Sequence, residues 1–139
     1  MSDFFSNIVF EKDDVITFPD GIPGFDGLTD FVLVRIPDQE PFEWLVCTQN
    51  PLIRFAVVNP LHILPDYDPK ISKEQLSPLA IETPDDLLIY VIITLKPILT
   101  ESTANCIGPV FINRKKKLGR QIVIDGDRYS VQQPLVGGA

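Results

Sequence analysis

Residues 42–60 read FEWLVCTQNPLIRFAVVNP, and this stretch decides the fold class. It holds two runs rich in β-branched and aromatic residues, 42–48 and 53–59, and a proline-containing turn follows each run. Two strands joined by so short a connection predict an antiparallel pair. The sequence therefore begins to read as a β protein at this point.

The first of these runs has two different faces, because side chains alternate along a strand. Phe42, Trp44 and Val46 share one face, and the opposite face carries Glu43, Leu45 and Cys47. Neither set is polar throughout. We therefore expect both faces of this strand to be covered by other parts of the chain.

Outward from this pair, short runs of similar composition recur along the chain, each bounded by Pro, Gly, Asn or Asp. They predict strands over residues 14–18, 30–36, 88–95, 107–113 and 120–125, with a further short edge strand over 129–131. The run 88–95 is apolar on both faces apart from Tyr90 and Thr94, so we expect it to be the least exposed strand.

Helical signals are short. Ser72 is placed to cap a turn over 73–76 that Pro78 stops, and Thr83-Pro84 begins a second such turn. The predicted fold class is mainly β: a small antiparallel pseudo-barrel, sandwich-like, with many short strands and one or two short helical turns. The pattern leaves barrel and sandwich open. We expect one domain over residues 1–139, frayed at 1–6 and 134–139.

Charge is unevenly distributed. The 139 residues carry a formal net charge of −7, and residues 1–50 hold ten acidic residues against two basic ones. An acidic chain gains little from releasing phosphate counterions, which argues against direct nucleic-acid binding and against a membrane surface. No run of 18 apolar residues and no basic signal-like start is present, so we expect a cytoplasmic protein. Acidity for solubility alone is the competing explanation.

The residues that catalysis or metal binding needs are scattered. His62 is the only histidine, and Cys47 and Cys106 stand alone, so neither a catalytic triad nor a zinc site is predicted. Both cysteines are expected to be buried and unpaired. Pairs of acidic residues lie beside Pro or Gly and are explained by turns. The sequence predicts no catalytic, cofactor-binding or metal-binding residue, and no enzyme.

Four consecutive cations, Arg114 to Lys117, separate the runs 107–113 and 120–125, which predict a hairpin. Such a tip can contact phosphate or an acidic protein surface. A solvated hairpin tip is the simpler explanation, because no aromatic residue is interleaved for stacking on bases.

Several segments, in order, resemble the FliW family of bacterial flagellar assembly factors. The matching stretches are Ile16 to Phe25, Phe42 to Leu45, Phe55 to Pro60, Pro65 to Tyr67 and Thr103 to Asn113. The resemblance implies a cytoplasmic, non-enzymatic pseudo-barrel protein without a cofactor, monomeric when free. It further implies two partners: the translational regulator CsrA, whose repression of flagellin mRNA translation it antagonises, and flagellin, which sequesters it.

Aromatic and proline residues in loops are typical anchors for a protein partner. The predicted partner-binding residues are Ile22, Pro23, Phe25, Phe42, Trp44, Asn50, Pro51, Tyr67, Asn105 and Pro109. Packing in the core is the competing interpretation for the aromatic members. Without the family, the chain could also be a small β-barrel that binds a small ligand or single-stranded RNA.

Overall fold

The computed structural model describes residues 8–126 and 128–135 and contains one short helix, α1 (Lys73–Leu76), among nine strands in that part of the chain. The strands are β1 (Ile16–Thr17), β2 (Asp30–Arg35), β3 (Glu43–Cys47), β4 (Arg54–Val58), β5 (Leu87–Thr94), β6 (Thr103–Ala104), β7 (Val110–Asn113), β8 (Leu118–Gln121) and β9 (Gln133–Pro134). The mainly β fold class is confirmed.

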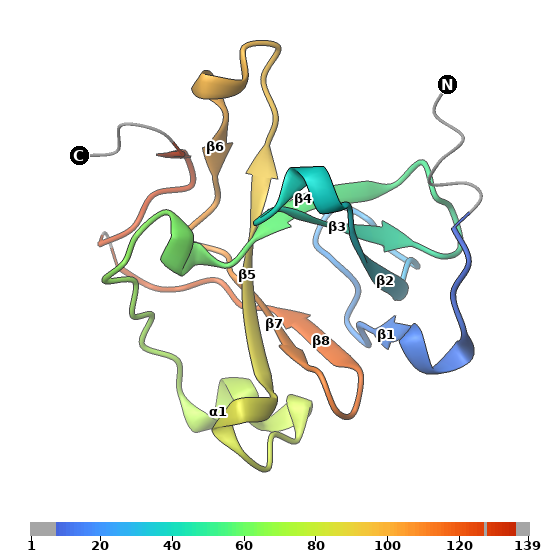
Figure 1. Cartoon of the computed structure of the whole chain (residues 1–139). Coiled ribbons are helices and arrows are strands. Elements are labelled where there is room, and N and C mark those ends of the chain that lie inside the picture. The colour runs from blue at the N-terminus through green and yellow to red at the C-terminus, as the bar shows by residue number, and fades with distance from the viewer. Residues whose placement is uncertain (1–7, 127, 136–139) are drawn as a thin grey trace.

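Seven strands close into a barrel in the order β4-β3-β2-β1-β8-β7-β5, and pairing of β4 with β5 completes the ring (Figure 1). Closure settles the choice between barrel and sandwich. The barrel is not wholly antiparallel, because β1 runs parallel to β8 where Thr17 pairs with Leu118. At the C-terminal end of β5, Ile93 and Thr94 pair with β6, and β9 pairs in turn with β6 (Figure 1).

The alternation of faces expected along the run 42–48, which contains β3, is confirmed by the packing on the two sides of the sheet. Leu45 and Cys47 belong to the inner core cluster with Phe18, Phe31 and six other buried residues, including Ile112. On the outer side, Phe42 and Trp44 pack against a second cluster. Both faces of this sheet region are covered, as the mixed composition indicates.

The outer side is covered by irregular chain and by α1. Ser72 caps α1 by accepting a hydrogen bond from the Gln75 backbone N–H, and Gln75 Oε1 accepts from the Ser72 N–H. The second expected helical turn is the 3-10 turn Pro84–Asp86, with proline at its first position. None of the helices in the described residues is long and apolar enough to cross a membrane.

The expectation that 88–95 forms the least exposed strand is wrong. Thr94 is exposed and half of β5 is only partly buried, whereas all four residues of β7 are buried. β7 is buried on both sides: Val110 and Ile112 pack in the inner cluster, while Phe111 packs under the segment around Leu79. The run of β5 is the more hydrophobic along the sequence, yet β7 is the more buried strand. Burial is therefore decided by packing on both faces of the strand.

The C-terminal expectations are also corrected. Residues 129–131 form no strand, because Tyr129 packs its ring on Tyr67 with centroids 4.5 Å apart and accepts a hydrogen bond from the Asp68 N–H. Pairing resumes in β9, where Pro134, expected to be frayed, lies opposite Thr103. The other residues expected to be frayed, 1–6 and 136–139, lie outside the described residues, and Leu135 is half-buried.

Candidate functional site

The register of three strands builds an apolar floor on the outer face of the barrel. Trp44 of β3 pairs with Ala56 of β4, and Ala56 pairs with Ile93 of β5. Side chains of paired residues point to the same face of a sheet, so the three lie in one row. Ala56 is much smaller than its neighbours on either side. The row is therefore lowest in its middle, between the indole and the isoleucine.

Two 3-10 turns form the walls of this hollow. One wall is the turn Pro37–Gln39 with Glu40 after it, and the other is the turn Leu99–Glu101. Together these residues enclose a groove of about 550 Å³, which we call the Trp44 groove. It is lined by Asp38, Gln39, Glu40, Phe42, Trp44, Ala56, Ile93, Leu95, Leu99, Thr100, Ser102 and Leu135.

Hydrogen bonds hold the near wall in place. Trp44 Nε1 donates to Gln39 Oε1 at 2.9 Å, which fixes the indole against the turn. The Gln39 N–H donates to the Ile36 carbonyl and the Phe42 N–H donates to the Gln39 carbonyl, both at 2.9 Å. The near wall is thus held by backbone and side-chain hydrogen bonds within the protein itself, which is a form of preorganisation.

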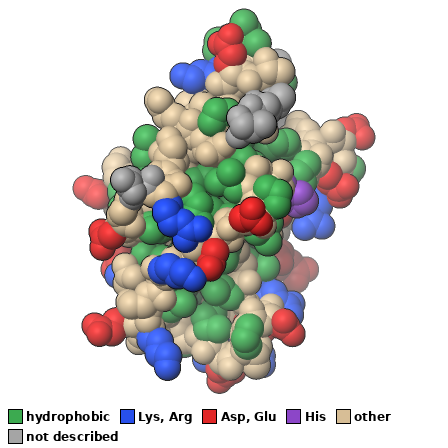
Figure 2. All heavy atoms as spheres, turned by 90° about the vertical axis from the view of Figure 1, so that its left-hand side faces the viewer, with side chains coloured by type: hydrophobic (Ala, Val, Ile, Leu, Met, Phe, Trp, Pro, Cys, Tyr) green, Lys and Arg blue, Asp and Glu red, His purple; other side chains and the backbone are tan. Residues whose placement is uncertain are grey.

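The far wall exposes large aliphatic side chains. Leu95 and Leu99 are 51% and 69% exposed, and neighbouring Ile98 is 58% exposed. Hydrophobic side chains also gather through the middle of another view of the surface, where Lys, Arg, Asp and Glu side chains lie among them (Figure 2). Contiguous exposed apolar surface of this kind is typical of interaction sites.

Comparison with known proteins assigns the chain to a family. A family model described as FliW protein matches residues 1–135. The chain belongs to the FliW family. The resemblance carried by its motifs is thereby confirmed.

The relatives agree in name and in extent. A protein named flagellar assembly factor FliW from Alkaliphilus metalliredigens (strain QYMF) is 40% identical over 133 residues, covering 95% of this chain and 82% of the relative. One of the same name from Caldanaerobacter subterraneus subsp. tengcongensis is 38% identical, covering 95% and 89%. A crystal structure of the flagellar assembly factor FliW matches with a TM-score of 0.86 at 30% identity, covering 92% of this chain and 89% of that one.

In this FliW-family chain, the groove brings together only two of the predicted partner-binding residues, Phe42 and Trp44, both half-buried in its lining. The sequence reasoning missed Leu95, Leu99 and the acidic residues of the near wall. A signal for the far wall was available: the segment 95–99 is apolar apart from Lys96, and its proline cannot continue the preceding strand.

Ile22, Pro23 and Phe25 lie together in a turn at another part of the barrel. Ile22 is buried, whereas Pro23 is exposed and Phe25 is half-buried with its ring edge-on to Phe55, centroids 5.2 Å apart. The exposed Asn50 shapes the turn between β3 and β4 by accepting from the Leu52 N–H. Pro51 is half-buried in the same turn.

Three other predicted residues have structural contacts. Tyr67 is buried and donates its hydroxyl to the Cys106 carbonyl at 2.8 Å, and burial is the main cause that raises its pKa. Asn105 Oδ1 accepts from the Ile107 and Gly108 N–H groups, and Pro109 is buried. The sequence indicated exposed loop positions for Ile22, Tyr67 and Pro109. All three side chains are buried instead. They face the protein because turns rich in proline here cover the core.

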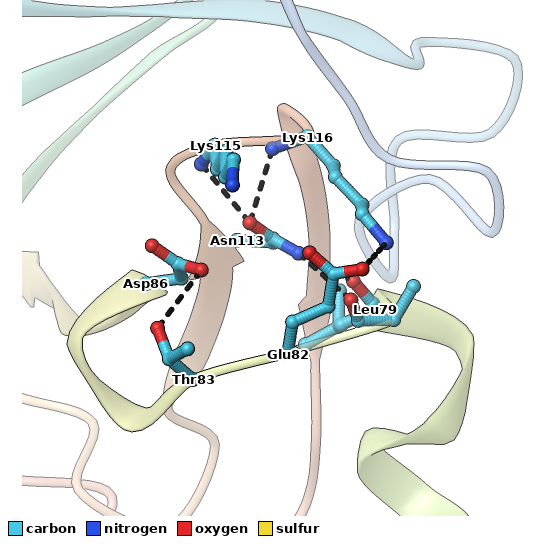
Figure 3. Close-up of polar contacts among 8 residues, drawn as sticks. Leu79, Glu82, Thr83, Asp86, Asn113, Lys115 and Lys116 are labelled. Atoms are coloured by element: carbon cyan, nitrogen blue, oxygen red, sulfur yellow. Dashed lines mark hydrogen bonds and ion pairs between the residues drawn. The ribbon is translucent and has the colours of Figure 1, made fainter.

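The basic tip is held by a buried asparagine (Figure 3). Asn113 of β7 donates from Nδ2 to the Leu79 and Ala80 carbonyls, and its Oδ1 accepts from the Lys115 and Lys116 N–H groups at 3.0 Å. This side chain joins the hairpin to the segment that precedes β5.

Carboxylates face part of that tip. Lys116 Nζ lies 3.5 Å from Glu82, and Arg114 lies 4.0 Å from Asp86. Two cations of the tip are therefore already close to carboxylates of the same chain, and this lowers the capacity of the tip to bind phosphate.

The groups that a catalyst would use are dispersed in the described residues. His62 is exposed in a 3-10 turn, and Cys47 and Cys106 are free and buried, as predicted for the cysteines. No cluster of three or more metal-ligating side chains occurs in the part of the chain that is described. A polar cluster joins buried Tyr90, whose hydroxyl donates to Glu43 at 2.9 Å, with Arg35, which lies 3.7 Å from Glu43. Burial and the neighbouring Glu43 raise the pKa of Tyr90.

Proposed function

We propose that this protein is a cytoplasmic flagellar assembly factor that works by exchanging partners. By binding the translational regulator CsrA, it antagonises the repression by CsrA of flagellin mRNA translation. Flagellin in turn sequesters this protein from CsrA. Membership of the FliW family over residues 1–135 is the observation that carries this proposal. The preformed apolar groove supports it, because a binding protein needs such a surface and no reaction chemistry is assembled around it.

Electrostatics offers a mechanism for the antagonism. An RNA-binding regulator presents cations to phosphate, and a docked protein of net charge −7 places a negative field beside them. That field extends about 8 Å at physiological salt. The exchange therefore does not require contact with the RNA-binding surface itself.

A titration of the purified protein against CsrA and against flagellin, each repeated with the other partner present, tests the proposal. Saturable binding of both, with mutual loss, is the expected result. Sedimentation of the free protein should give a monomer. Failure to bind either partner would refute the exchange function, and a stable ternary complex would refute simple competition in favour of coupling between two sites.

A further inference from the structure

We propose that the Trp44 groove is the docking site for a partner segment that carries large apolar side chains flanked by Lys or Arg. The inference rests on the proposed function, in that it assigns one surface to one of the exchanged partners. It commits to a protein segment with both features, because the floor and the walls of the groove call for different chemistry.

The floor selects apolar side chains. Over Ala56, between Trp44 and Ile93, the groove has room for a side chain that none of these residues fills. Leu95 and Leu99 stand beside this space with more than half of each side chain exposed. A leucine or an aromatic side chain placed there would remove apolar surface from water on both partners, at roughly 25 cal/mol per Å².

The wall selects cations. Asp38 and Glu40 line the groove, and none of the described residues in the lining is Lys, Arg or His. Glu101 belongs to the opposite turn. Basic side chains beside the apolar anchors would therefore meet carboxylates without competition from cations in the lining. This distinguishes the groove from the hollow lined by Asp14, Arg35, Arg114 and Lys117, where charges of both signs meet.

The site also carries its own reporter. Trp44 is the only tryptophan of the chain and lies half-buried in the groove. A segment that covers the indole should shift its fluorescence emission to shorter wavelength and protect it from acrylamide quenching. Occupancy of this groove can thus be separated from binding elsewhere on the molecule.

The test compares the full-length wild type with Leu99→Asp and with Val123→Asp, titrated against CsrA and flagellin. Val123 is 62% exposed and does not line the groove, so it is a matched control for the exposed Leu99. We expect Leu99→Asp to weaken one partner about tenfold or more, and Val123→Asp to change its affinity less than about twofold. Circular dichroism should show that both variants fold, since both side chains lie at the surface.

A second variant tests the charges. Asp38→Lys combined with Glu40→Lys should weaken the same partner, and the difference from wild type should shrink as salt is raised. An unchanged affinity of both partners for Leu99→Asp and for the charge variant would overturn the docking inference while leaving the exchange function standing.

A peptide probe keeps the two proposals separable if neither partner binds. A tryptophan-free synthetic peptide of alternating Leu and Lys should shift Trp44 emission in the wild type and in Val123→Asp. Its affinity for Leu99→Asp should be about tenfold weaker. That result would support the groove's chemistry although the proposed function had failed. No shift in the wild type, or an equal shift in all three proteins, would overturn the inference.

Discussion

Gly119 shows how one residue constrains the barrel. A Cβ built on it would lie 2.4–2.7 Å from three ring atoms of Phe18, a fully buried side chain of the inner cluster. No side chain fits at this place, because the ring occupies the space directly over the β8 backbone. The glycine is needed for close approach and not for an unusual backbone angle.

Gly119→Ala should therefore lower the free energy of unfolding by roughly 1–3 kcal/mol through overpacking. Urea denaturation monitored by Trp44 fluorescence measures the change. Combining it with Phe18→Leu should cost less than the sum of the two single changes, because the smaller side chain yields the space. Additive losses would show that the contact with Phe18 is not the cause.

The buried thiol of Cys106 gives the protein a dependence on alkaline pH. Burial raises the pKa of this thiol from 9.0 to about 11. The unfolded chain loses the proton first, so the contribution to stability is complete below pH 9 and is lost as the pH rises toward 11. We expect a loss of roughly 2 kcal/mol across this window.

Thermal denaturation of the wild type and of Cys106→Ala between pH 8 and pH 11 checks this expectation. The variant should lose less stability than the wild type over this range. Tyr67 and Tyr90, whose pKa values burial also raises, add to the loss above pH 10 in both proteins. Identical pH profiles for the two proteins would contradict the role of the thiol.

At the scale of elements, Asn113 decides how the basic hairpin tip is attached. Its four hydrogen bonds satisfy two carbonyls before β5 and two N–H groups in the tip, and the side chain is 1% exposed. The tip is therefore a firmly placed turn, although its composition alone indicates only a solvated loop.

Asn113→Ala should lower the free energy of unfolding by roughly 2–4 kcal/mol, since it leaves buried polar groups without partners. Asn59→Ala is the matched control: Asn59 is exposed and caps a 3-10 turn by accepting from the Leu61 N–H, so about 1 kcal/mol is expected. Equal losses for the two variants in urea denaturation would argue against the buried network.

At the scale of the whole molecule, net charge and pairing of the tip predict weak affinity for RNA. A chain of charge −7 whose Arg114 and Lys116 face Asp86 and Glu82 should bind single-stranded RNA negligibly even at low salt. Fluorescence anisotropy with a labelled oligonucleotide measures this. Binding that is detectable at low salt, falls steeply with salt and is lost in Lys115→Ala with Lys117→Ala would favour the RNA-binding alternative.

Local signals in the sequence determined the β fold class, most strand positions, the cap of α1 and the family, because alternation, turn residues and motif order are properties of neighbours along the chain. They also indicated Phe42 and Trp44. The sequence did not reveal that β1 and β8 pair in parallel, since that pairing joins residues about a hundred positions apart.

Tertiary structure alone decided the groove. Trp44, Ala56, Ile93 and Leu99 come from separate segments, and their common surface exists only because the register sets three strands side by side and closes the barrel. The same long-range packing buried Ile22, Tyr67 and Pro109, whose loop positions had indicated exposure. Neighbours in the chain specify local conformation, whereas burial depends on which distant residues arrive on top.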